Sequence, residues 1–123
     1  MTEAMNATAR VDQMTDLTER LTACLIAEAR AFETRRPQDA AATVAATQEL
    51  ANTYRRESAQ LKANPSAIAG APAARRSALI KATEAFEAVL TRHARAVEAA
   101  RQISEGLVKT IAAEVAEIGR AHV

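Results

Sequence analysis

The fold is decided by residues 73–120, which read AARRSALIKATEAFEAVLTRHARAVEAARQISEGLVKTIAAEVAEIGR without a single proline. Large apolar side chains recur through this stretch mostly at intervals of three, four or seven residues, which is the spacing of one face of an α-helix. They are Leu79, Phe86, Val89, Leu90, Val97, Ile103, Leu107, Ile111, Val115 and Ile118. We therefore predict one long helix. Gly106 inside it costs about 1 kcal/mol relative to alanine and allows a local bend near that point.

Two shorter helices precede the long one. The first is predicted over residues 8–34 from Val11, Met14, Leu17, Leu21, Leu25 and Phe32. The second is predicted over residues 38–62 from Val44, Thr47, Ala51, Tyr54 and Leu61. Between them Pro37 marks either a turn, after which the chain runs back antiparallel, or a kink in a continuing helix. Residues 63–72 hold two of the three prolines and one glycine, so we predict a loop there.

The composition favours a single all-helical domain over residues 1–123. Glycine and proline are scarce, with three of each, and the chain is too short for two hydrophobic cores. With two phenylalanines, one tyrosine and no tryptophan, the core must rest on aliphatic side chains and alanine, which buries little apolar area. The predicted fold class is all-α: an antiparallel helical hairpin plus a long third helix, in a coiled-coil-like three-helix bundle.

Charge and cysteine content narrow the functional classes. Sixteen Lys and Arg against fifteen Asp and Glu leave a formal net charge of +1, which gives no field that would attract nucleic acid. We expect no nucleic-acid partner, and no membrane span either, since no stretch of about 20 apolar residues is free of charge. The single Cys24 and the lack of a signal-peptide pattern at the start of the sequence predict a cytoplasmic location.

The predicted helices differ in length, and this difference points to a binding surface. Helices of roughly 26 residues span about 40 Å, whereas residues 73–120 span about 70 Å as one straight helix. The hairpin should therefore cover the long helix only as far as about Arg101. Beyond it the helix presents an apolar face on an arc of about 140°, into which Glu114 intrudes. We predict that this face binds a protein partner through Ile103, Leu107, Val108, Ile111, Val115 and Ile118.

No pattern in the sequence indicates catalysis, a cofactor or a metal site, so we expect a protein that is not an enzyme. His93 and His122 lack the spacing that brings two ligands onto one helix face, and Cys24 has no second cysteine or nearby histidine. We interpret His93 as a hydrogen-bonded or half-buried structural residue and Cys24 as a small core residue. Glu28 stands where the helix over residues 8–34 would next need an apolar side chain. It either pairs with an arginine across the bundle or fixes the register of the helices.

Two segments resemble the FlgN-like flagellar export chaperones, small cytoplasmic bacterial proteins that hold hook-filament junction subunits before secretion. Residues 21–33, LTACLIAEARAFE, are similar to the first helix of that family, and residues 48–54, QELANTY, to the following helix. The resemblance extends from Leu17 to Ile118. It implies that the C-terminal amphipathic helix grips a helical terminus of the client, and the helix lengths point independently to the same segment.

The sequence thus predicts a cytoplasmic type III flagellar export chaperone that holds a helical segment of a hook-filament junction protein by hydrophobic burial. The alternative is a structural homo-oligomer, such as a homodimer, or an adaptor: the same face then pairs with another helix and no secretion client is bound. A third class, an enzyme within a helical bundle, predicts a bound metal or a deep polar pocket.

Overall fold

The computed structural model describes residues 2–121, and in that range every regular element is a helix. The long helices are α1 (Thr2–Glu33), α3 (Val44–Ala63) and α5 (Ala73–Ala121), and two short ones, α2 (Pro37–Ala41) and α4 (Ser66–Ala69), connect them. The predicted all-α class is confirmed. None of these helices is both long enough and apolar enough to cross a membrane.

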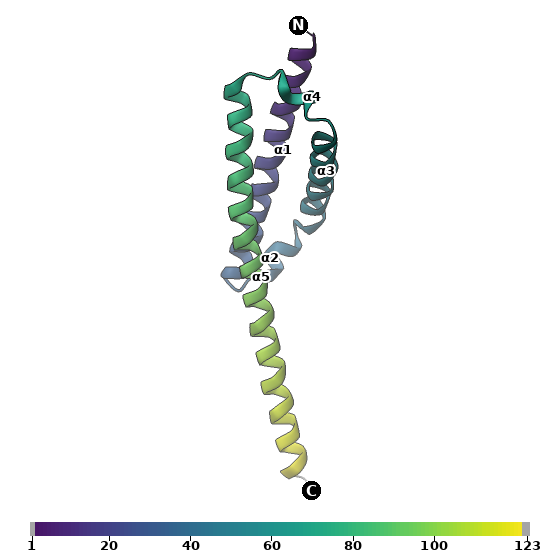
Figure 1. The fold of residues 1–123 in the computed structure, drawn as a ribbon. Helices are drawn as coiled ribbons and strands as arrows, with labels where there is room; N and C mark the ends of the chain where they lie inside the picture. The colour runs from purple at the N-terminus through teal and green to yellow at the C-terminus, as the bar shows by residue number, and fades with distance from the viewer. Residues whose placement is uncertain (1, 122–123) are drawn as a thin grey trace.

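Helix α1 lies at the centre of the arrangement and contacts each of the other four helices (Figure 1). Its interface with α5 is the most extensive one. Helix α3 runs antiparallel to α1, whereas α5 runs parallel to it. The parallel direction is visible in two ion pairs, since Arg75 meets Asp12 near the start of both helices and Arg92 meets Glu33 further along both.

The chain turns before Pro37 and does not continue as a kinked helix. Arg35 adopts the left-handed conformation, with a φ of 60°. Its N–H donates to the carbonyl of Phe32 at 3.1 Å, and the N–H of Arg36 donates to the carbonyl of Ala31 at 2.8 Å. These two bonds form the Schellman pattern, which satisfies the last carbonyls of a helix. The left-handed residue redirects the chain, and Pro37 then opens α2.

The segment predicted as one helix over residues 38–62 is two helices, and this expectation was wrong. A turn at Ala42 and Thr43 separates α2 from α3, with the N–H of Thr43 donating to the carbonyl of Ala40 at 3.1 Å. This hydrogen bond joins residues three apart, whereas those of an α-helix join residues four apart. Ala40 is buried and α2 packs on α1, so the chain first closes the end of the bundle and then changes direction. The predicted loop over residues 63–72 likewise contains the one-turn helix α4.

The described residues form two small clusters of buried side chains. One joins α1 to α4 and the start of α5, through Ala7, Val11, Ala71, Ile68 and Leu79. The other joins α1, α3 and α5, through Leu21, Leu25, Phe86, Leu50, Ala51, Tyr54 and Val89. The ring centroids of Tyr54 and Phe86 lie 4.8 Å apart, so an aromatic contact links α3 to α5. The α5 residues of both clusters come from the first half of that helix, so its second half lies outside the core.

Candidate partner-binding site on helix α5

Helix α5 continues far beyond the helices that cover it. Its last buried side chain is Ala96, Ala100 is half-buried, and every described side chain from Arg101 to Glu117 is exposed. Figure 1 shows this part of α5 projecting from the bundle with no helix beside it. We term residues 101–121 the overhang, which is roughly 30 Å long at 1.5 Å per residue. The cover of α5 therefore ends near Arg101, as the helix lengths predicted.

The side chains that we predicted to bind a partner lie on the overhang. Those that the structure describes keep 51% to 65% of their surface exposed. They are Ile103, Leu107, Val108, Ile111 and Val115, and we term them the apolar stripe. The sixth predicted side chain, that of Ile118, lies outside the described residues. Contiguous exposed apolar side chains of this kind are typical of surfaces that bind another protein.

The apolar stripe continues the face by which α5 packs in the bundle. That packed face consists of Leu79, Ala82, Phe86, Val89, His93 and Ala96, all buried or half-buried. At 3.6 residues per turn, the mean directions of the packed face and of the apolar stripe differ by less than about 10°. A helix bound to the apolar stripe would therefore lie in line with α1.

Side chains of α1 fix the level at which α5 leaves the bundle. Glu28 is buried, and its Oε2 lies 3.0 Å from Nε2 of His93. The ring of Phe32 meets the imidazole edge-on, with 6.3 Å between ring centroids. The predicted hydrogen-bonded and half-buried environment of His93 is confirmed. One of the two predicted alternatives was that Glu28 pairs with an arginine across the bundle. Glu28 does pair across the bundle, but its partner is His93. The parallel register of α1 and α5 brings these two residues together.

A second pair ties the last residue of α1 to α5. Arg92 donates from Nε and Nη2 to the two carboxylate oxygens of Glu33, at 2.9 and 2.6 Å. These hydrogen bonds hold the pKa of Glu33 below its ordinary value and raise the pKa of Arg92. Because the pair is bidentate, it restrains the direction as well as the distance between the two helices.

The charged side chains of the overhang are arranged unevenly around the helix. Off the apolar stripe, Arg101 pairs with Glu98 at 2.6 Å and also with Glu105. The hydrogen bond from Arg101 lowers the pKa of Glu98. Glu114 instead falls within the arc of the apolar stripe and makes no ion pair with any residue whose side chain the structure describes. The stripe therefore carries one uncompensated acidic group.

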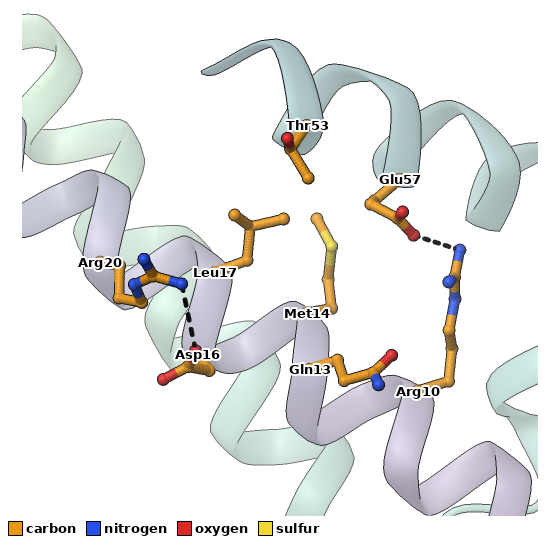
Figure 2. A pocket seen from close by; sticks show the side chains of 8 residues that line it. All are labelled: Arg10, Gln13, Met14, Asp16, Leu17, Arg20, Thr53 and Glu57. Carbon is orange, nitrogen blue, oxygen red and sulfur yellow. Dashed lines mark ion pairs between the residues drawn. The ribbon is translucent and has the colours of Figure 1, made fainter. Parts of the chain in front are cut away.

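A hollow of about 240 Å³ between α1 and α3 is a second candidate site (Figure 2). Met14 and Leu17 of α1 form its apolar part, and Thr53 faces them from α3. At one end Arg10 forms an ion pair with Glu57 at 2.6 Å. The hollow is smaller than the range of about 300–1,000 Å³ that is usual for ligand pockets. We interpret it as part of the α1–α3 contact, which the Arg10–Glu57 pair closes and which no sequence pattern indicated.

The metal-ligating side chains of the described residues offer no further candidate site. No group of three or more His, Cys, Asp or Glu side chains within residues 2–121 is placed to hold a metal ion. Cys24 is half-buried on α1, and His122 lies outside the described residues. The apolar stripe of α5 is therefore the principal candidate site.

Comparison with known proteins relates the chain to a flagellar protein. The chain is 51% identical over 113 residues to the flagellar basal-body protein FlbY of Caulobacter vibrioides, an alignment that spans 92% of this chain and 76% of that protein. No protein-family model and no solved structure matches the chain. The predicted flagellar relationship is confirmed, while the narrower resemblance to FlgN-like chaperones stays a prediction. By its identity and coverage, the chain belongs to the family of the flagellar basal-body protein FlbY.

Proposed function

We propose that this protein is a chaperone of flagellar assembly that holds a helical segment of a hook-filament junction protein in the cytoplasm before export. The observation that carries the proposal is the apolar stripe: five exposed aliphatic side chains on a projecting helix, in a chain related to a flagellar basal-body protein. The resemblance of residues 21–33 and 48–54 to FlgN-like chaperones supports the same class of client.

The apolar stripe has a size that suits reversible binding. Covering the exposed half of each of its five side chains contributes roughly 1 kcal/mol, or about 5 kcal/mol in total. Association costs several kcal/mol in lost translational, rotational and side-chain freedom. The apolar contacts alone therefore give a modest affinity, to which charged groups at the rim add specificity. A modest affinity suits a client that has to be released for export.

The bundle contributes to binding by presenting the overhang as a formed helix. The Glu28–His93 and Glu33–Arg92 pairs attach α5 to α1 immediately before the overhang begins. A client therefore meets a helix that is already ordered, and ordering it during binding costs little. The client's own segment, packed as a helix along the stripe, completes a helix-to-helix interface.

The test uses the purified full-length protein and purified hook-filament junction proteins of the same bacterium, with binding measured by calorimetry. Ile111→Asp places a charge in the apolar stripe, and Lys109→Asp places the same side chain on the opposite face of α5. We expect Ile111→Asp to weaken binding by about tenfold or more, because it buries a charge in the interface. Lys109→Asp should change the affinity by less than about twofold.

A structural homo-oligomer is the rival function, and sedimentation velocity separates it from the chaperone. A dimer that Ile111→Asp dissociates, together with no binding of any hook-filament junction protein, would overturn the proposal. A chain ended after Ala100 provides a second variant. It removes only exposed side chains among those described, so the bundle should fold while client binding is lost.

A further inference from the structure

The face of α5 that continues from the bundle into the overhang carries one polar side chain in each part. His93 and Glu114 are 21 residues apart, and at 3.6 residues per turn their directions differ by about 60°, so each lies within the arc of this face. In the bundle, His93 faces the carboxylate of Glu28 on α1 at 3.0 Å. In the overhang, Glu114 faces no helix, and no residue with a described side chain pairs with it.

An occupant of the apolar stripe therefore has to accommodate an acidic group. Covering the Glu114 carboxylate with an apolar side chain removes its water and opposes binding. A lysine or arginine at the facing position forms an ion pair and adds to the affinity and to the rate of association. Glu114 therefore selects for a basic occupant.

The same acidic group disfavours a second copy of this chain as a parallel occupant. The bundle itself uses the parallel arrangement, because α1 runs in the direction of α5. In a parallel, in-register pair of overhangs, Glu114 of one copy would face Glu114 of the other. Like charges placed opposite each other destabilise such a pair. The charge pattern therefore disfavours a parallel second copy as the occupant.

We propose that the partner helix continues the line of α1 along the apolar stripe and carries a lysine or arginine opposite Glu114. This inference rests on the proposed function and adds the charge by which the client is distinguished from other amphipathic helices. Two observations support it: the packed face and the apolar stripe point in the same direction, and His93, the polar side chain of the packed face, is paired with a side chain of α1. The roles differ between the two places: in the bundle α1 supplies the acidic side chain, whereas in the overhang α5 supplies it and the partner supplies the basic one.

A peptide with the sequence of residues 12–33 serves as the probe, because α1 already packs on the first part of this face. Moved along α5 by 21 residues, which is about 32 Å, the peptide brings its residue 28 to the level of Glu114. Two fluorescent versions are compared, one with the native Glu28 and one with Glu28→Lys. The full-length protein is titrated into each at low salt, and binding is followed by anisotropy. We expect the Lys version to bind about five- to tenfold more tightly.

Variants of the full-length protein test whether Glu114 is the origin of this preference. Glu114→Lys should invert the preference, and Glu105→Lys, the same change off the apolar stripe, should leave it unchanged. Raising the salt to about 0.5 M should reduce it, because salt screens exposed charges. Equal affinity for the two peptides, or no binding of either, would overturn the inference.

The result also separates this inference from the proposed function. Equal affinity for both peptides would leave the chaperone function standing, because the apolar stripe would still capture a helix. A clear preference for the Lys version, with no binding of any hook-filament junction protein, would show that the client is a different protein. It would still support a basic side chain opposite Glu114.

Discussion

Oε2 of Glu28 lies 3.0 Å from Nε2 of His93, and this contact joins α1 to α5 where α5 leaves the bundle. The other oxygen of Glu28, Oε1, is buried with no hydrogen-bond partner among the described residues. A buried carboxylate with one oxygen unsatisfied contributes little net stability, since the cost of removing its water offsets the contact it makes. The pair instead fixes the register of two parallel helices.

His93→Leu should lower the free energy of unfolding by about 2–3 kcal/mol, because it leaves the buried Glu28 with no partner at all. The double variant Glu28→Leu/His93→Leu should recover most of that loss, because an apolar contact replaces both polar groups. Urea unfolding followed by circular dichroism measures both. A single variant as stable as the wild type would contradict this account of the pair.

Arg35→Gly should raise the free energy of unfolding by about 0.5–1 kcal/mol and the Tm by a few degrees. Arg35 has a φ of 60°, where a side chain costs about 1–2 kcal/mol that glycine avoids, although glycine loses more chain entropy on folding. Arg36→Gly is the matched control, since Arg36 has a φ of −124° and gains nothing from the change. Equal effects of the two substitutions on Tm would show that the left-handed turn carries no strain.

Phe86→Ala and Leu107→Ala should differ sharply although both lie on one face of α5. Phe86 is buried in the cluster that joins three helices, and its truncation should cost about 3–5 kcal/mol. Leu107 is 59% exposed, and its truncation should change the free energy of unfolding by less than about 0.5 kcal/mol. Chemical denaturation gives both values. A large loss at Leu107 would mean that the overhang packs against something in the free protein.

The Glu33–Arg92 pair should contribute to acid sensitivity. Its hydrogen bonds hold the pKa of Glu33 below the ordinary value, so the folded state prefers the charged carboxylate. That contribution is present above the unfolded-state pKa of about 4.3 and is lost as the pH falls through the lower folded-state pKa. Replacement by Arg92→Met should therefore flatten the fall in urea midpoint between about pH 5 and pH 3. An unchanged pH profile in this variant would contradict the assignment, and high salt should weaken the effect in the wild type.

The sequence predicted best those features that depend on one helix at a time. The unbroken periodicity after Pro72 predicted α5 over nearly its full length, and comparison of helix lengths placed the end of its cover near Arg101. Both inferences need only the rise per residue and the positions of prolines. The exposure of the apolar stripe followed from the same geometry.

Features that depend on contacts between helices were less predictable. The break between α2 and α3 falls in an alanine-rich segment that contains no glycine or internal proline to mark it, and packing of Ala40 at the end of the bundle decides it. The left-handed Arg35 occupies a place where glycine is usual, so no residue type indicated it. The pairing of Glu28 with His93 required the parallel register of α1 and α5, which only the fold supplies.

The central claim is that the apolar stripe binds a helix of a flagellar client, and hydrogen–deuterium exchange of the full-length protein tests it most directly. Exchange is measured with and without a purified hook-filament junction protein of the same bacterium. The account predicts slower exchange of amides in residues 101–118 on binding, with the bundle amides of α1 and α3 nearly unchanged. The claim would be contradicted if exchange slowed only around Arg10 and Glu57, or if the amides of the overhang exchanged at an unchanged rate at saturating client.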